Sequence, residues 1–355
     1  MTPWHRNWLE TVNFGHPSWI ECNIKLSRSA WHEYGRDLES VLLKHPKTWP
    51  DYKEGDYKAI VERRWPPMEN PEVEYVDAWG CVWRTSQYGY IGTVQHHPLG
   101  TDDALASFTP PAAETYNGGF DPVDFAEAAD NLEKTAAEGR LTSGGLGHGY
   151  FLLRLEYLLG FENLMCNLMD PSDDFRRLVD TVHDLNRTAV RHWMDAGAKY
   201  IWLAEDLGAQ DRSIIGPRAF REWALPRYKE LHGMVQDAGR YTDFHTDGNI
   251  MDIADQILDI APSVLNPQDQ ANGVENLRDA FKGKLCLRLD FDRQKTMPFG
   301  TPRDCADLVE YEIKTLGSER GGLMFNFEIR KDVSPDNVDA IASACERWST
   351  WWFEK

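Results

Sequence analysis

From residue 200 to the end of the chain, short strand-like runs alternate with longer helix-like segments. The pattern predicts strands at 200–205, 240–245, 263–266, 285–290 and 322–328, and helices at 217–238, 249–260, 274–281, 302–316 and 335–352. The connections are short, and each pair of successive strands is separated by one helix. This alternation is typical of an α/β domain with a parallel sheet.

The side chains of the late strands separate by polarity. In the strand at 285–290 the leucines share one face, while Arg288 and Asp290 share the other, and the strand at 322–328 divides in the same way. A central strand of an open, doubly wound sheet is covered by helices on both faces and is apolar throughout. Strands with one apolar and one polar face instead favour an (α/β)8 barrel of the TIM type.

Residues 1–140 are less regular and predict a helical and irregular N-terminal extension. They include a Trp- and Pro-rich stretch at 46–71, a hairpin-like aromatic pair beginning at Glu74, and a helix at 121–138 with Pro122 in its first turn. No sequence repeat and no low-complexity linker interrupts the chain. We therefore expect a single barrel domain over residues 1–355, with the extension and aromatic-rich insertions inside 1–140.

Composition limits the partners and the compartment. The net charge of -19 argues against binding nucleic acid or an anionic membrane by bulk electrostatics. The six cysteines include no Cys-x-x-Cys pair, which predicts free thiols in a reducing cytosol. The first residues lack the layout of a signal peptide, and no apolar run is as long as a membrane span. The expected location is cytoplasmic.

Polar residues gather where the predicted strands end. In a barrel all the carboxyl ends of the strands form one rim, so these side chains are expected to converge on an active site. An earlier glycine-rich loop, residues 144–149, adds a histidine. The candidate site residues are His148, Glu205, Asp206, His245, Asp247, Asn266, Gln268, Asp290, Asn326 and Glu328.

Several of these positions also have a purely structural interpretation. Arg288 and Asp243 are candidates for a buried ion pair, and Asp247 is placed to cap the helix that follows it. The loop 144–149 is either an anion cradle in front of a helix or a tight turn. His245 is a candidate for a buried structural histidine, although it shares a loop with a carboxylate.

Several motifs carry a resemblance to a known family. They are Glu205-Asp-Leu-Gly, Pro217-Arg-Ala-Phe-Arg-Glu-Trp-Ala-Leu-Pro226, His245-Thr-Asp-Gly-Asn249, Leu265-Asn-Pro-Gln268 and Asp332-Val-Ser-Pro-Asp-Asn337, with Trp79-Gly80 and Gly160-Phe-Glu-Asn upstream. Together they resemble the uroporphyrinogen decarboxylase superfamily. The resemblance implies an (α/β)8 barrel and either porphyrin decarboxylation or cobalamin-dependent methyl transfer.

The two branches of that superfamily differ in motifs. Porphyrin decarboxylases carry an N-terminal Arg-Gln-Ala-Gly-Arg motif, which residues 19–34 lack. Thiol-methylating methyltransferases bind zinc through His-x-Cys-Gly and a later cysteine. This chain keeps His245 and Gly248 but has Asp247 in place of the first cysteine. The later cysteine is also missing, and that region reads Phe325-Asn-Phe-Glu328. Oxygen ligands replace sulfur ligands, which suits a metal that polarises an oxygen.

The resemblance therefore implies a corrinoid-dependent methyltransferase of the O-demethylase kind. It would take a methyl group from a methoxylated aromatic molecule and pass it to a corrinoid held by a partner protein. His245, with Glu205 or Asp247, would hold zinc as a Lewis acid. Without metal, the candidate general acids are Glu205, Asp206 and Glu328.

The aromatic residues Trp79, Trp83 and Tyr90 are candidates for stacking on the substrate ring. Three other functions stay open: a decarboxylase of a non-porphyrin carboxylate, a metal-dependent hydrolase, and a non-catalytic barrel that binds a ligand or a corrinoid partner. The hydrolase lacks the expected His-x-His motif in residues 19–25. The sequence identifies neither the substrate nor the oligomeric state, monomer or homodimer.

Overall fold

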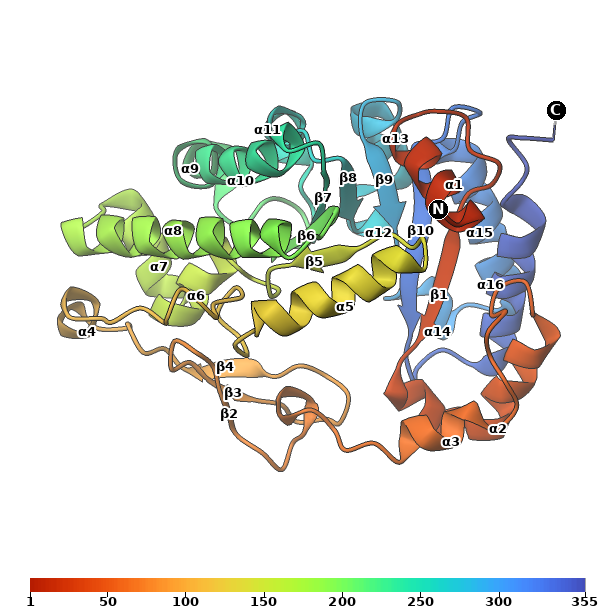
Figure 1. The fold of residues 1–355 in the computed structure, drawn as a ribbon, viewed down its shortest axis with the longest axis horizontal. Helices are drawn as coiled ribbons and strands as arrows, with labels where there is room; N and C mark the ends of the chain where they lie inside the picture. Colours follow the sequence, from red (N-terminus) through yellow and green to blue (C-terminus); the bar gives the residue numbers. More distant parts are fainter. Residues whose placement is uncertain (355) are drawn as a thin grey trace. The chain divides into compact units, whose positions relative to one another are not determined.

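The fold is built around a parallel β-sheet. The computed structural model describes residues 1–354, and in it the sheet has the strand order β1-β10-β9-β8-β7-β6-β5 (Figure 1). The strands are β1 (Cys22–Leu26), β5 (Ser143–Gly145), β6 (Tyr200–Asp206), β7 (Tyr241–Asp247), β8 (Val264–Pro267), β9 (Cys286–Leu289) and β10 (Leu323–Ile329). The pairs β5–β6, β6–β7, β9–β10 and β10–β1 are parallel.

The strand order distinguishes a barrel from an open sheet. From β5 to β10 each strand is added beside the one before it, and β1 lies next to β10. A doubly wound sheet would reverse this direction at a switch point, whereas in a TIM-type barrel the chain always winds in one direction. The predicted fold class, an α/β barrel of the TIM type with an irregular N-terminal extension, is confirmed.

The chain divides into two compact units by internal contacts. The first unit contains residues 1–5, 67–86 and 90–265, and the second contains residues 6–66, 87–89 and 266 onward. The boundaries pass through β8 and through the first helix, α1 (Pro3–Val12). The expectation of one domain over residues 1–355 stays a prediction.

The first unit holds β5, β6 and β7 and a small antiparallel sheet. That sheet has the order β2-β3-β4, with β2 (Tyr75–Val76), β3 (Val82–Arg84) and β4 (Thr93–His96), where a hairpin-like pair was expected. The helices of this unit are α4 (Asp102–Ala106), α5 (Phe125–Ala137), α6 (Leu152–Leu159), α7 (Phe161–Met169), α8 (Asp173–Asp195), α9 (Gly216–Ala219), α10 (Leu225–Asp237) and α11 (Ala254–Ile260). Single 3-10 turns lie at Pro67–Glu69 and Met251–Ile253.

The second unit holds β1, β9 and β10. Its helices are α2 (Arg28–Lys44), α3 (Asp56–Val61), α12 (Asp269–Asn272), α13 (Val274–Phe281), α14 (Thr296–Phe299), α15 (Pro302–Leu316) and α16 (Pro335–Trp348). Phe291 stacks on Phe325 of β10 at 4.4 Å and meets the Phe327 ring edge-on at 4.9 Å. These contacts cover the apolar face that the sequence assigned to β10.

Two helices differ from the prediction. Helix α5 begins at Phe125, because the side chain of Asp124 accepts hydrogen bonds from the N–H groups of Ala126 and Glu127, so Pro122 lies before the helix. The helix predicted at 217–238 contains a π-helical turn, Phe220–Ala224, between α9 and α10. Pro226 follows this turn and has no N–H to continue the regular ladder.

Of the helices in residues 1–354, none combines the length and the apolarity that crossing a bilayer requires.

A buried ion pair holds the aromatic-rich part of the extension. Both Asp77 and Arg154 have fully buried side chains, and Arg154 Nη1 lies 2.5 Å from Asp77 Oδ2. The Asp77 carboxylate also accepts hydrogen bonds from the N–H groups of Trp79 and Cys81 and from Trp83 Nε1. Arg154 Nη2 donates to the carbonyl of Gly118 at 3.0 Å. One carboxylate thus organises the loop before β3, and one guanidinium on α6 neutralises it.

Replacing Arg154 tests this arrangement. Arg154→Met leaves the Asp77 charge buried without its cation, so we expect the free energy of unfolding to fall by about 3–5 kcal/mol. Urea denaturation followed by tryptophan fluorescence measures the change. The matched control is Arg140→Met, which removes an ion pair to Glu138 whose side chains are 65% and 61% exposed and should cost less than about 1 kcal/mol. Equal losses in the two variants would contradict the assignment.

Candidate functional site

Two histidines and one aspartate converge in the first unit. One ligand atom from each of His148, Asp206 and His245 lies within 4.8 Å of the others. His148 Nε2 is 3.2 Å from Asp206 Oδ1, and His245 Nε2 is 4.0 Å from the same oxygen. Asp247 Oδ1 lies 3.5 Å from His245 Nε2. We refer to His148, Asp206 and His245 as the His-Asp-His cluster.

The register of three neighbouring strands explains why these residues meet. Ala204 pairs with His245 and Asp206 pairs with Asp247 across β6 and β7. The loop after β5 is held against β6 because Gly149 N–H donates to the carbonyl of Ala204 at 2.8 Å. The cluster therefore forms at the carboxyl ends of β5, β6 and β7, where barrel enzymes place their chemistry.

The loops that follow β6 and β7 touch through their backbones. A Cβ atom added to Gly248 would lie 2.0 Å from the carbonyl oxygen of Gly208, and one added to Gly208 would lie 2.4 Å from the Asn249 nitrogen. Gly248 also has a φ of +78°, which favours glycine. The glycines of the Leu-Gly and Asp-Gly motifs are thus required for the two loops to approach, and with them Asp206 and Asp247.

In the His-Asp-His cluster, Asp206 and His148 each stabilise the charged form of the other. Burial alone would raise the pKa of Asp206, but the hydrogen bond and charge of His148, with the charge of His245, lower it below its ordinary value. Burial would likewise lower the pKa of His148, but the hydrogen bond and charge of Asp206 raise it. The side chains of His148, Asp206 and His245 are 34%, 32% and 15% exposed, so all three are partly accessible to solvent.

Glu205, predicted as a metal ligand and catalytic acid, has a different position. Its side chain is fully buried, and its two oxygens accept hydrogen bonds from the N–H groups of Phe151, Leu152 and Leu153 at 2.5, 3.1 and 3.1 Å. Burial raises its pKa to about 7, although these N–H groups act in the opposite direction. Since side chains alternate along a strand, Glu205 points to the start of α6 while Asp206 points to the cluster. Glu205 therefore caps a helix and does not join His245.

Trp79 and Trp83, predicted to stack on a substrate ring, lie in the core. They are 8% and 3% exposed. Trp79 packs against Phe108 and Tyr116, and Trp83 packs edge-on against Tyr157 at 4.7 Å. Both residues are held there by Asp77, whose carboxylate accepts hydrogen bonds from Trp79 N–H and from Trp83 Nε1. A lone arginine inside the apolar run Leu152-Leu-Arg-Leu was the sequence signal for such a buried pair. Tyr90 is half-buried in the same unit.

Asp243 was a candidate for a buried ion pair with Arg288, and Asp247 for a helix cap. Asp243 is buried and accepts a hydrogen bond from the Tyr200 hydroxyl, and its pairing with Arg288 stays a prediction. Helix α11 starts without a side-chain cap, and the Asp247 carboxylate lies beside His245 instead. Asp247 is thus part of the surroundings of the His-Asp-His cluster.

The remaining candidates belong to the second unit. Asn266 donates to the carbonyl of Arg288, Asp290 lies 3.3 Å from the guanidinium of Arg293, and Glu328 is exposed beside Arg330. Asn326 is half-buried, and so is Gln268. Of the predicted set, the structure brings together His148, Asp206, His245 and Asp247 in the first unit.

The second unit has a carboxyl pair that sequence reasoning missed. Asp269 and Glu312 are 4% and 0% exposed, and the carboxyl group of each shifts the pKa of the other. Burial raises the pKa of Asp269 to about 7, and burial together with the Asp269 charge raises that of Glu312 well above its usual value. Burial and the proximity of two like charges therefore both oppose ionisation of this pair. Glu312 lies on an amphipathic helix, so its sequence context suggests an ordinary surface residue.

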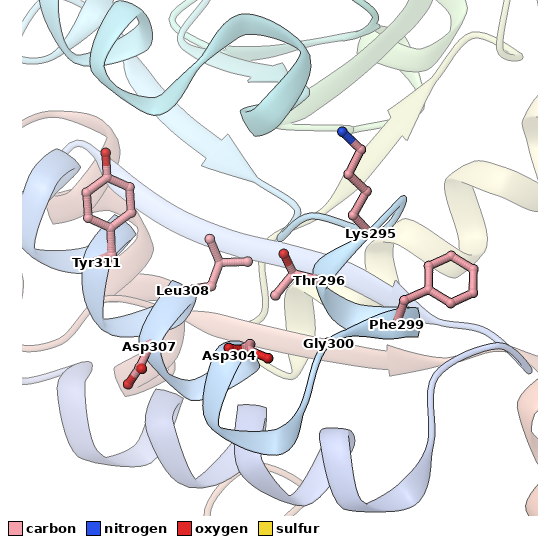
Figure 2. A pocket seen from close by; sticks show the side chains of 8 residues that line it. All are labelled: Lys295, Thr296, Phe299, Gly300, Asp304, Asp307, Leu308 and Tyr311. Carbon is pink, nitrogen blue, oxygen red and sulfur yellow. The ribbon is translucent and has the colours of Figure 1, made fainter.

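Two hollows in the second unit offer less chemistry than the cluster. A cavity beside Asp269 and Asp290 has a volume of about 10 Å³, enough for one water molecule at most. A wide surface hollow of about 540 Å³ is lined by Lys295, Thr296, Phe299, Gly300, Asp304, Asp307, Leu308 and Tyr311. Figure 2 shows the Lys295 ammonium group well apart from the carboxylates of Asp304 and Asp307. Because it is open and its charges do not converge, this hollow is not a candidate active site.

Comparison with known proteins identifies the family. The family model described as uroporphyrinogen decarboxylase (URO-D) matches residues 97–348, which is more than half of the chain. The chain therefore belongs to the uroporphyrinogen decarboxylase family, as its motifs predicted. No curated protein matches the sequence closely enough to be reported.

One of two similar solved structures shows a shared fold. A methyltransferase from Methanosarcina mazei is 14% identical, with a TM-score of 0.61, over 97% of this chain and 98% of that chain. A B12-independent methionine synthase from Shewanella sp. W3-18-1, solved in complex with selenomethionine, is 11% identical, with a TM-score of 0.39, over 63% and 66% of the two chains. The first likeness shows a shared fold, and the second is too weak to carry an argument.

The Asp269–Glu312 pair predicts a pH dependence of stability. A carboxyl group whose pKa is raised in the folded state stabilises the fold at pH values below its unfolded pKa, near 4.5, and this contribution is lost as the pH rises through the folded pKa. Each such proton changes the free energy of unfolding by about 1.4 kcal/mol per pH unit. We expect the stability of the wild type to fall between pH 5 and 8, and Glu312→Gln, whose amide donates without ionising, to flatten this decline.

Denaturation in urea at several pH values measures the effect. The control is Glu310→Gln on the same helix, where the carboxylate is partly exposed and pairs with Lys314. That variant should keep the wild-type pH dependence. A Glu312→Gln profile parallel to the wild type would show that Glu312 is ionised in the folded protein.

Proposed function

We propose that this member of the uroporphyrinogen decarboxylase family is a metal-assisted methyltransferase. It removes a methyl group from a methoxylated small molecule and passes it to a corrinoid held by a partner protein. The observation that carries the proposal is the His-Asp-His cluster at the carboxyl ends of β5, β6 and β7. The methyl donor and the corrinoid acceptor follow from the sequence resemblance to the methyltransferase branch.

The cluster fits a zinc ion by chemistry and by distance. Zinc accepts imidazole nitrogen and carboxylate oxygen, and catalytic sites use three protein ligands with one position open. Around a tetrahedral zinc the ligand atoms lie about 3.3–3.6 Å apart. The separations here, 3.2 Å for His148–Asp206 and 4.0 Å for His245–Asp206, need only small side-chain shifts. His148, Asp206 and His245 would hold the ion, in place of the earlier set of His245 with Glu205 or Asp247.

A zinc ion bound there would supply Lewis acidity to an ether oxygen, which makes the departing oxygen a better leaving group. The protein residues prepare the site for it. Asp206, with its lowered pKa, stays ionised and orients His148, and Asp247 lies beside His245 and orients that ring. Because the pKa of His148 is raised, zinc binding must release a proton, so zinc affinity should weaken as the pH falls.

Metal content tests the proposed ligands. We expect about one zinc per chain in wild-type protein loaded with zinc and dialysed, and its loss in His245→Ala, because two ligands do not retain a catalytic zinc. Elemental analysis measures it. The matched control is His96→Ala, an exposed histidine on β4, which should keep its zinc. Wild-type protein without metal after loading would overturn the zinc assignment.

Turnover tests the proposed reaction. Zinc-loaded protein is incubated with methoxylated aromatics and cob(I)alamin, and the free phenol and methylcobalamin are quantified. We expect phenol and methylcobalamin in equal amounts, and a rate at least about 100-fold lower in His245→Ala. Carbon dioxide released from a carboxylated substrate, with no methylcobalamin, would instead favour a decarboxylase. Substrate binding without either product would favour a non-catalytic barrel.

A further inference from the structure

Helix α7 presents large apolar side chains to solvent. Phe161 and Met169 are 51% and 85% exposed, and Met165 between them is half-buried. The three residues are spaced by four, so they form one row along the helix. We refer to Phe161, Met165 and Met169 as the α7 stripe. Single exposed apolar residues are ordinary on protein surfaces, but a row of them on one short helix indicates a surface that binds a partner.

Hydrogen bonds and packing fix the direction in which the stripe points. The side-chain amide of Asn163 donates to the carbonyls of Gly100 and Leu159, each at 3.0 Å. Leu164 and Leu168 are 1% and 8% exposed and attach α7 to the first unit. The stripe therefore cannot turn inward unless the helix loses these contacts.

The surroundings of the stripe are acidic. Residues 161–175 contain no lysine, arginine or histidine and four carboxylates: Glu162, Asp170, Asp173 and Asp174. Asp174 pairs with Arg177 at 2.9 Å, while the other three carboxylates belong to exposed residues. An apolar row next to exposed negative charges is complementary to a segment whose apolar side chains are flanked by Lys or Arg.

The charges favour this occupant over two others. Two copies of this chain that met through the stripe around a two-fold axis would bring the same carboxylates face to face. An anionic membrane surface would be repelled by these carboxylates and by the net charge of -19. A basic segment is instead attracted, and the flexible methionine side chains adapt to its apolar residues.

We propose that the α7 stripe is a docking surface for a basic amphipathic helix of a partner protein. The apolar side of that helix packs on the stripe, and its Lys or Arg residues approach Glu162, Asp170 and Asp173. Helix α7 belongs to the connection between β5 and β6, which also carries His148 of the His-Asp-His cluster (Figure 1). The partner thus contacts the segment that supplies one histidine of the cluster. This docking does not depend on the proposed reaction, because binding is measured without turnover.

Binding of a designed peptide tests the surface. The probe is a fluorescein-labelled peptide of about 16 residues, long enough to form a helix, with leucines on one side and lysines on the other. Fluorescence anisotropy should show saturable binding to the wild type. Binding to the double variant Phe161→Ser, Met169→Ser should be at least about 10-fold weaker, because less apolar surface is buried on docking. Serine is chosen because an acidic replacement would itself attract the lysines.

The matched control is Phe299→Ser. This variant removes a ring of the second unit that is 82% exposed, so it changes an equally accessible apolar residue away from the stripe. We expect it to bind the peptide as tightly as the wild type does.

Charge and position are tested separately. Glu162→Gln combined with Asp170→Asn should weaken binding several-fold at low salt and make it less dependent on salt concentration. The exposed thiol of Cys166, next to Met165, reports the position of the peptide. In the wild type its alkylation by iodoacetamide, read by peptide mapping, should slow several-fold when the peptide is bound.

Four results would overturn the proposal. The first is no saturable binding to the wild type, and the second is equal affinity for the wild type and the double serine variant. The third is equal affinity for a peptide of the same composition whose leucines are distributed around the helix, since overall negative charge would then explain the attraction. The fourth is a mass of two chains in light scattering that is lost in the double serine variant, since a second copy would then cover the stripe.

Discussion

The first unit depends on a carboxylate that is buried near the end of β6. Glu205 is fully buried, and the start of α6 supplies the three N–H groups that make this burial tolerable. The start of α6 is therefore fixed against β6. Helix α6 also carries Arg154, so the position of the helix determines where Arg154 pairs with Asp77. Asp77 in turn accepts hydrogen bonds from Trp79 and Trp83 and so fixes their positions. The charged groups of Glu205, Arg154 and Asp77, each paired or hydrogen-bonded, thus connect β6, α6 and the N-terminal extension.

Asp206, the next residue of β6, lies on the opposite face of the strand. Asp206 follows Glu205 directly, but it is a third exposed and lies between two imidazoles. Burial governs the pKa of Glu205, and the histidines govern that of Asp206, so the two pKa values move in opposite directions. Two successive residues thus place one carboxylate against the start of α6 and the other between two histidines, because side chains alternate along a β-strand.

The fold could be predicted from sequence because its signals are local and repeated. Strands and helices alternate, and the late strands have one apolar and one polar face; both patterns indicate a barrel. The observed elements lie within a few residues of the predicted ones. The site was harder because alternation shows that Glu205 and Asp206 face opposite ways without showing which one faces the histidines. The burial of Trp79 and of Glu312 was not predicted for a related reason: Tyr116, which packs against Trp79, and Asp269, which influences Glu312, are distant from them in sequence. No local pattern contains such pairs.

The contact between Gly208 and Gly248 limits how members of a family like this one can diverge. Two peptide planes fill the space between the loops after β6 and β7, so no side chain can be introduced there, and neither loop can change its path alone. Residues next to these glycines are consequently poor positions for altering substrate choice. Changes are easier to accommodate farther along the loop between β6 and α9, where residues 209–212 are exposed. An engineer should therefore leave the two glycines unchanged and vary those exposed positions first.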